Sequence, residues 1–251
     1  MRTPFIVGNW KMNLTLEEAD SFLDQITNKL PDSNQVECAI AASPIFLETL
    51  TKYCKNSPLK SSAENCFYKD KGAYTGEVSP YALSEMGVNY VMLGHSERRK
   101  YFNETNKTVN KKVKAVLQNH MIPIICCDET MTKQKTDDHM DWVVNPVAES
   151  LNGVSSKDAQ NVVIGYEPSW AIGTGKSASV SETQEACCLI RKTIAELYDE
   201  KVASKVRILY GGSVNDKNVQ ELMQQKDVDG VLAGTASLKP KEFLKIVNYS
   251  K

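Results

Sequence analysis

Short apolar runs alternate along the whole chain with stretches in which apolar residues recur at helical spacing. Several runs are β-branched and apolar on both faces of the pleat, as expected of parallel strands lying between a core and covering helices. The pattern predicts strands at 5–8, 37–41, 60–64, 90–93, 122–126, 162–167, 207–211 and 230–233. It predicts helices at 16–29, 45–53, 79–86, 105–119, 138–151, 179–198, 214–224 and 240–248. Pro240 suits a first helical turn, and Ser181 with Gln184 has the pattern of a capping box.

The strict alternation of strands and helices predicts parallel pairing through right-handed crossovers. Two arrangements satisfy this order, a closed (β/α)8 barrel and an open doubly wound sheet. Eight units in 251 residues match the size of the barrel. No linker, low-complexity run or break in composition divides the sequence, so we expect one domain over residues 1–251.

The balance of charges narrows the classes of partner. Lys and Arg number 30, Asp and Glu number 31, and the formal net charge is -1. This balance gives no electrostatic attraction to nucleic acid or to an anionic membrane. The densest basic stretch, 107–114, has valines at helical spacing, which is typical of the solvated face of an amphipathic helix. Residues 1–13 contain only a short apolar run, too short for a signal peptide or a membrane span.

The cysteines indicate a reducing compartment. They number seven, no pair has the spacing Cys-x-x-Cys, and the histidines are scattered. An odd count without a secretory segment favours reduced thiols in the cytoplasm, and the scattered histidines argue against a zinc site.

Polar side chains follow three of the predicted strands. Asn9 and Lys11 come after the first strand, His95 and Glu97 follow the fourth, and Glu167 ends the sixth. In a (β/α)8 barrel the active groups lie at the carboxyl ends of the strands. These five side chains are therefore candidates for a single site.

Each candidate has a structural and a catalytic interpretation. Glu167 could cap a helix, but it ends a buried run before Pro168, where burial would raise its pKa toward neutrality and suit a general base. A lone histidine is usually structural, but His95 precedes a helix-opening stretch whose dipole favours a neutral, hydrogen-donating imidazole. Lys11 is either a surface lysine or a cation that attracts an anionic substrate, with Glu97 as its partner.

Glycine-rich turns after the last two strands predict a phosphate site. Residues 211–213 (GGS) and 234–235 (GT) lie where barrels bind phosphate through loop amides, although tight turns would need the same glycines. The sequence GTGKS at 173–177 is not a P-loop, because position 170 is Trp rather than glycine. No strand ends in a dinucleotide-binding G-x-G-x-x-G. The long connection 65–79 lacks periodicity, which favours a functional loop or an interface over a free surface loop.

Four motifs carry a resemblance to a known family. GNWKMN (8–13), GHSERR (94–99), YEPSWAIGTGK (166–176) and YGGSV (210–214) closely resemble triosephosphate isomerases, in order and along essentially the whole chain. The resemblance implies a barrel that interconverts dihydroxyacetone phosphate and D-glyceraldehyde 3-phosphate in glycolysis and gluconeogenesis, with no metal or organic cofactor. This family is itself a standard example of a glutamate base, a neutral histidine and a loop that excludes water.

The resemblance also implies a role for each candidate residue. Glu167 would move the proton between C1 and C2 through an enediolate. His95 would polarise the substrate oxygens with help from Asn9, and Lys11 would supply positive charge beside Glu97. Backbone amides would hold the phosphate, at Gly173, Ser213, Gly234 and Thr235.

A lid and a dimer follow from the same resemblance. Residues 168–178 would close over the site and suppress loss of phosphate from the enediolate. The lid would run from Pro168 to Ala178, and residues matching Tyr210 and Ser213 would latch it when it is closed. When it is open, Trp170 would contact Glu129. Family members are typically homodimers, in which the residue matching Thr75 reaches toward Asn9 and His95 of the other subunit.

Several positions depart from the family pattern. Asp128 stands where a glycine is usual, so a loop that needed a positive φ there would be strained. Thr235 replaces the second phosphate glycine, Ser169 an apolar lid residue, and Glu64 a glutamine near the dimer loop. The arginine usual near the lid is missing. None of these changes removes an expected catalytic group.

Two other functions stay open at this point. One is a phosphate-binding barrel with different carbon chemistry, against which the lid pattern around Glu167 argues. The other is a catalytically impaired phosphate-binding barrel acting as a binding protein. The retention of Asn9, Lys11 and His95 together with Glu167 argues against it.

Overall fold

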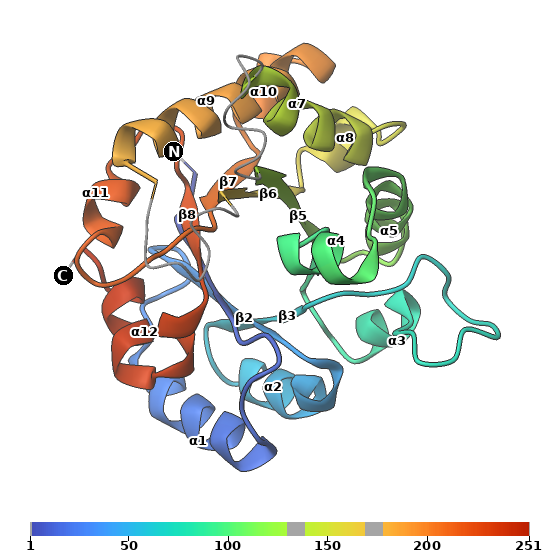
Figure 1. The fold of residues 1–251 in the computed structure, drawn as a ribbon. Coiled ribbons are helices and arrows are strands. Elements are labelled where there is room, and N and C mark those ends of the chain that lie inside the picture. The colour runs from blue at the N-terminus through green and yellow to red at the C-terminus, as the bar shows by residue number, and fades with distance from the viewer. Residues whose placement is uncertain (1, 130–138, 169–177, 251) are drawn as a thin grey trace.

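The strands close into a ring. In the computed structural model, which describes residues 2–129, 139–168 and 178–250, each strand pairs in parallel with the next along the chain and β1 pairs with β8 (Figure 1). The strands are β1 (Phe5–Asn9), β2 (Glu37–Ala42), β3 (Leu59–Ala63), β4 (Tyr90–Leu93), β5 (Ile122–Glu129), β6 (Val163–Pro168), β7 (Arg207–Tyr210) and β8 (Gly230–Ala233). The closed (β/α)8 barrel is therefore confirmed, and the open doubly wound sheet is excluded.

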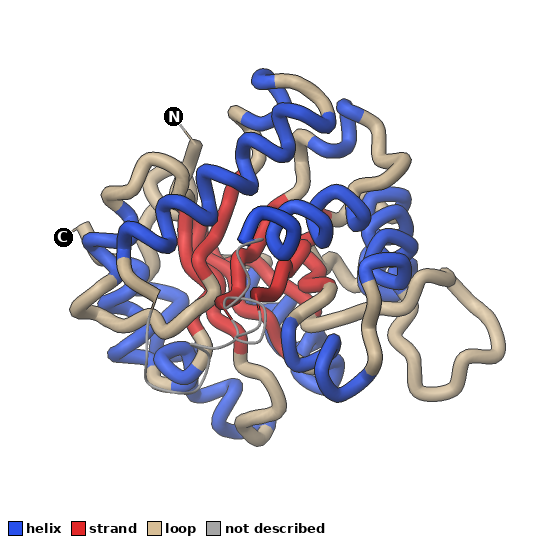
Figure 2. The backbone as a smooth tube through the Cα atoms, turned by 45° about the horizontal axis from the view of Figure 1, so that its top comes forward, coloured by secondary structure: helices blue, strands red, loops and turns tan. Residues whose placement is uncertain are grey.

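Helices form a layer around the ring of strands (Figure 2). The α-helices of the described ranges are α1 (Leu16–Ile26), α2 (Leu47–Cys54), α3 (Pro80–Glu85), α4 (Ser96–Phe102), α5 (Asn106–Gln118), α7 (His139–Ser150), α8 (Ser156–Ala159), α9 (Val180–Leu197), α10 (Glu200–Ala203), α11 (Val219–Met223) and α12 (Pro240–Val247). Short 3₁₀ helices lie at Thr27–Lys29, Pro44–Phe46 and Thr235–Leu238. None of the helices described here has the length and apolar character to cross a membrane.

Strand side chains alternate between the barrel interior and the helix layer. On β1, Phe5 and Val7 belong to the interior cluster, whereas Ile6 packs in the outer cluster with the helices. Both faces of the strands are buried, which explains why the sequence shows continuous apolar runs. The next inward positions, Asn9 on β1 and Glu167 on β6, stand at the carboxyl end of the barrel. The fold thus directs two of the candidate side chains into one space.

Among the helices that differ from the prediction, two differ for local reasons that the structure shows. The helix expected at 214–224 is shorter, because the Asn215 side chain accepts hydrogen bonds from backbone amides and competes with helical pairing. Helix α4 was not predicted, because Ser96 is its only buried residue and its sequence therefore shows no apolar stripe.

The capping box of α9 begins two residues before the predicted one. The Ser179 hydroxyl accepts the Glu182 amide hydrogen, and the Glu182 carboxylate accepts that of Ser179. Ser181 lies inside the helix, so its pairing with Gln184 as a cap was wrong. Two overlapping patterns competed here, and the one that begins the helix earlier satisfies more amides.

Candidate active site

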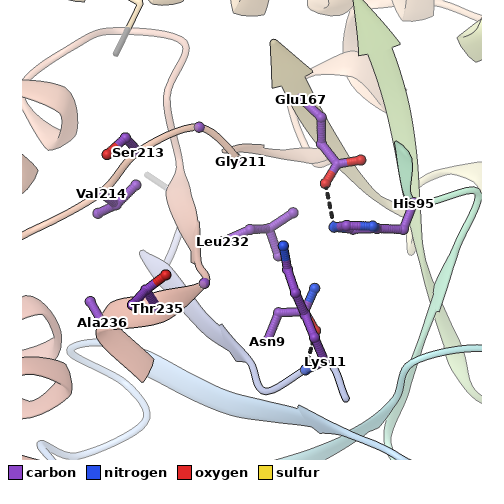
Figure 3. A pocket seen from close by; sticks show the side chains of 12 residues that line it. Asn9, Lys11, His95, Glu167, Gly211, Ser213, Val214, Leu232, Thr235 and Ala236 are labelled. Atoms are coloured by element: carbon purple, nitrogen blue, oxygen red, sulfur yellow. Dashed lines mark hydrogen bonds and ion pairs between the residues drawn. The ribbon is translucent and has the colours of Figure 1, made fainter. Parts of the chain in front are cut away.

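A cavity of about 260 Å³ opens at the carboxyl ends of the strands (Figure 3). Figure 3 shows Glu167 and His95 on one side and the loops of Ser213 and Thr235 on the other, with Lys11 directed between them. The cavity is lined by Asn9, Lys11, His95, Glu167, Gly211, Gly212, Ser213, Val214, Leu232, Gly234, Thr235 and Ala236. The structure thus brings together candidates from five different strand ends.

Glu167 is a buried carboxylate with a hydrogen bond on each oxygen. His95 Nε2 lies 2.8 Å from Glu167 Oε1, and the Ser96 amide donates to Oε2 at 2.8 Å. Burial raises the pKa of Glu167, but the His95 ring, the Ser96 amide and Lys11 bring it below its ordinary value. The expected rise in the pKa of Glu167 is therefore wrong for the free protein, because these partners outweigh desolvation.

His95 is fixed in one tautomer by the start of α4. Its Nδ1 accepts the Glu97 amide hydrogen at 3.3 Å, so the ring hydrogen lies on Nε2 and faces Glu167. Burial lowers the pKa of His95, but the Glu167 carboxylate and its hydrogen bond raise it above the ordinary value. A second ring proton would sit on Nδ1 and break the hydrogen bond from the Glu97 amide, and the Glu97 carboxylate, 3.6 Å from Nδ1, is too far to replace it with a direct hydrogen bond. The geometry therefore favours a neutral imidazole beside a charged carboxylate.

Lys11 is held in an uncommon backbone conformation. Its φ of 53° lies in the left-handed region, which costs a non-glycine residue about 1–3 kcal/mol. Its amide donates to Asn9 Oδ1 at 3.2 Å, and its Nζ lies 2.8 Å from Glu97 Oε1. The side chain of Lys11 remains 27% exposed, so the ammonium group faces the cavity while Glu97 holds it from the rim.

The loops opposite Glu167 are closely fitted to their neighbours. A Cβ atom at Gly212 would lie 2.1 Å from the Tyr210 hydroxyl oxygen, so a side chain there would displace that ring. Asn218 donates to the Ser213 carbonyl at 2.9 Å and fixes the turn. After Gly234 the chain enters the 3₁₀ helix that begins at Thr235. Amides near a helix start and in glycine turns are the usual ligands of phosphate.

The two end residues of the predicted lid, Pro168 and Ala178, are held by contacts with the barrel. Pro168 is the last residue of β6, and the amide of the buried Ala178 donates to the Tyr210 hydroxyl at 3.2 Å. Trp170 and Gly173 lie outside the described residues, as does Ser169.

Strand β5 is longer than predicted. It continues through Asp128 and Glu129, whose backbones pair in register with Glu167 and Pro168 of β6. Asp128 therefore lies in a strand and not in a loop that needs a positive φ, so the condition for strain at this position is not met. Pairing with β6 continues the strand past Cys126, although the apolar run predicted as the strand ends there.

Thr75 lies away from this cavity within the same chain. It is exposed on the loop before α3, which projects from the barrel (Figures 1 and 2). Two further groups at the site were not predicted: Leu232, which lines the cavity from β8, and the Ser96 amide. Leu232 was accessible to sequence reasoning, because it lies one inward position beyond Gly230 on an alternating strand. Within the described ranges, no three acidic, histidine or cysteine side chains gather as a metal site would require.

A carboxylate, a neutral imidazole and an ammonium group around one cavity of a (β/α)8 barrel define an acid–base enzyme for a small anionic substrate. The sequence matches the family described as triosephosphate isomerase over residues 4–250. The chain belongs to the triosephosphate isomerase family. Its activity is that of a triosephosphate isomerase in glycolysis and gluconeogenesis.

Individual relatives cover the chain from end to end. It is 53% identical over 249 residues to the triosephosphate isomerase of Pediococcus pentosaceus, which covers 99% of each chain. It is 50% identical over 248 residues to that of Lactobacillus helveticus, covering 99% of this chain and 98% of the relative. The enzyme of Latilactobacillus sakei is 48% identical over 250 residues and 100% of both chains.

Proposed function

We propose that this chain works as a single barrel domain in which Glu167 is the base and His95 the electrophile for interconverting dihydroxyacetone phosphate and D-glyceraldehyde 3-phosphate. The observation that carries this assignment is the buried contact of 2.8 Å between Glu167 Oε1 and His95 Nε2. Each group supplies the partner that the other needs while the cavity holds no substrate. A substrate oxygen that takes the Nε2 hydrogen releases the carboxylate for proton transfer.

The proton transfer follows from this exchange. Glu167 removes a proton from C1 of the ketose, the C–H electron pair forms the C1–C2 double bond of an enediolate, and the carbonyl electron pair moves onto the C2 oxygen. A proton passes from the C1 oxygen to the C2 oxygen, and the same carboxyl group returns its proton to C2, which leaves a carbonyl group at C1. When His95 and the Ser96 amide no longer contact Glu167, burial remains and raises the pKa of the carboxyl group. The base therefore becomes stronger once substrate replaces its resting partners.

Charge on the enediolate oxygens is met by groups placed in advance. His95 donates from Nε2, the Asn9 amide group lines the same cavity, and the Lys11 ammonium adds positive charge. Such preorganised donors stabilise developing charge more than they stabilise a neutral carbonyl. The amides of Ser213, Gly234 and Thr235 would hold the phosphate at the opposite wall, with Gly173 completing the set.

The substitution Glu167→Gln tests the assignment of the base. In a coupled assay we expect kcat/KM to fall about 1000-fold, because the amide keeps the shape of the side chain and cannot accept the proton. Glu242→Gln, at a half-exposed side chain in the first turn of α12, is the matched control and should retain full activity. Full activity of Glu167→Gln would overturn the assignment.

We also propose that the protein assembles as a homodimer. Large apolar side chains lie exposed beside the site, with Met12 98%, Ile45 75% and Phe102 65% exposed. Met12 and Phe102 line a second cavity of about 440 Å³ that borders Asn9 and His95. Thr75 of a second copy would enter this cavity, and the apolar residues would be covered.

Thr75→Arg tests the dimer. A charged side chain at the tip would be desolvated in the cavity, so we expect sedimentation to show monomers at concentrations where the unchanged protein is dimeric. Lys69→Arg, which keeps the charge on the exposed part of the same loop, is the matched control. A monomeric unchanged protein would contradict the proposal directly.

The proposed location is the cytoplasm. Cys38, Cys54 and Cys66 are free thiols, and burial raises the pKa of Cys54 and of Cys66 to about 12. Such thiols stay protonated and persist where the medium is reducing. Titration of the unfolded protein with a thiol reagent should find its cysteines reduced, and a disulfide in protein isolated from cells would contradict this location.

A further inference from the structure

The thioether of Met92 contacts a group of the proposed catalytic machinery. Met92 lies on β4 in the interior of the barrel and is 1% exposed. The Asn9 Nδ2 atom donates to its sulfur at 3.6 Å, although the two residues are 83 positions apart in the sequence. A thioether is a weak acceptor, and a contact of this kind orients a donor at small cost when the donor is needed elsewhere.

The space for this contact is created by the strands between β1 and β4. Ala41 on β2 pairs in register with Asn9, and Ser62 on β3 pairs with Ala41. Both are small, so the interior beside Asn9 is open enough for a long side chain from β4 to reach across. Methionine is unbranched and polarizable, which suits it to fill such a gap.

Two contacts specify one orientation of the Asn9 amide. Oδ1 accepts the Lys11 amide hydrogen at 3.2 Å, and one Nδ2 hydrogen meets the Met92 sulfur. Rotating the amide by half a turn would set its NH₂ group against the Lys11 amide hydrogen and its oxygen against the sulfur. The second Nδ2 hydrogen then remains for the cavity, which Asn9 lines.

We propose that Met92 is a positioning residue for the isomerase reaction: its sulfur fixes the Asn9 amide so that one N–H points at the substrate oxygens. This inference rests on the proposed role of Asn9. Met92 is not one of the described residues that line the cavity of the site, so its effect must pass through Asn9. Losing one weak hydrogen bond predicts a loss in kcat of about three-fold, with KM changed less than two-fold.

A double-mutant cycle tests the inference. Met92→Leu keeps the volume and removes the acceptor, and a Leu-for-Met exchange is tolerated in cores. We expect kcat to fall about three-fold in the unchanged background and to stay constant in the Asn9→Ala background, because the coupled group is gone. Met121→Leu, a buried methionine before β5, is the matched control and should leave kcat unchanged in both backgrounds.

The outcomes separate the two proposals. An equal loss from Met92→Leu in both backgrounds, or no loss in the first, overturns the role of Met92 and leaves that of Asn9 standing. An Asn9→Ala variant with full kcat overturns the role of Asn9 and, with it, this inference. Urea unfolding of all variants shows whether a loss in kcat comes from a destabilised fold. If the variants with lower kcat are also the ones with a lower unfolding free energy, the result counts against a positioning role for Met92.

Discussion

The two ends of the barrel both hold charged groups, and they satisfy them differently. At the amino end, Arg207 pairs with the Glu37 carboxylate and lies 4.4 Å above the Phe5 ring. The Tyr90 hydroxyl donates to Glu37 at 2.6 Å and accepts from Arg207 at 3.1 Å. Each of these polar groups is paired with another group of the chain at the amino end of the barrel interior. None of the three is therefore available to bind a ligand.

At the carboxyl end the partners are temporary. Glu167 and His95 contact each other, yet each lies on a cavity where a ligand could replace the other. Lys11 pairs with Glu97 and still faces the cavity. The difference indicates that one end stabilises the barrel and the other keeps its hydrogen bonds available for exchange. This division is the usual one in (β/α)8 enzymes.

The largest effect is expected from a substitution that changes only the carboxyl end of the barrel, and it is an effect on activity. Lys11→Met removes positive charge from the cavity, and we expect kcat/KM to fall about 1000-fold. The unfolding free energy should change by less than about 1 kcal/mol, since a partly exposed ion pair contributes little. The coupled assay and urea unfolding measure both quantities. Lys239→Met, at an exposed pair with Glu242, is the control and should change neither.

The reciprocal change belongs to the amino end. Arg207→Met leaves the Glu37 carboxylate largely buried without its cation, which should lower the unfolding free energy by about 3–5 kcal/mol. We expect kcat/KM to stay within about two-fold, because the site lies at the other end of the barrel. Adding Glu37→Gln should restore part of the stability. A ten-fold loss of activity in a folded Arg207→Met protein would show that the two ends are coupled.

Glu64 sharpens the comparison, because it is a carboxyl group near the site without a full set of partners. Its Oε1 is buried and has no hydrogen-bond partner among the described residues, and burial raises its pKa to about 8 although the Lys11 amide lowers it. An acid whose pKa is raised by folding stabilises the fold in its protonated form. That contribution is complete below the unfolded value of 4.5 and is lost as pH rises through about 8.

Glu64→Gln should therefore remove a pH dependence. The unfolding free energy of the unchanged protein should fall between about pH 5 and about pH 9, and the variant should lack this fall. The gain in the variant at the higher pH should be on the order of a few kcal/mol. Urea unfolding at several pH values measures it, with Glu85→Gln on α3 as control. Parallel pH curves for Glu64→Gln and unchanged protein would refute the assignment.

The smallest effect is expected at an ordinary surface pair. Lys245 and Asp216 lie 2.8 Å apart with side chains 63% and 39% exposed. Lys245→Ala should change the unfolding free energy by less than about 0.5 kcal/mol and leave activity unchanged. A larger change would show that a charged pair far from both ends of the barrel can still contribute to stability or activity.

Much of the fold could be predicted because local patterns determine it. The apolar runs located the strands, and their alternation with helices indicated parallel pairing. Helix α4 escaped because its sequence has no apolar stripe, and the cap of α9 was misplaced because two serines offered overlapping patterns.

Most of the polar side chains that the structure places around the cavity could be predicted, but not how they interact. Position at a strand end singled out Glu167 and His95, whereas the direction of the pKa shift of Glu167 depends on a hydrogen bond from Ser96. The contact of Asn9 with Met92 crosses the barrel interior between strands that are not neighbours. Sequence spacing carries no direct signal for such contacts.

The closed order of strands sets when the active site can first exist. β1, with Asn9 at its end, pairs with β8, and the register joins Phe5 to Gly230. During synthesis at about 5–20 residues per second, the first strand therefore waits many seconds with one edge uncovered before its last partner leaves the ribosome. The enzyme cannot acquire activity in stages as its domain emerges, because the ring closes only when nearly the whole chain has been made.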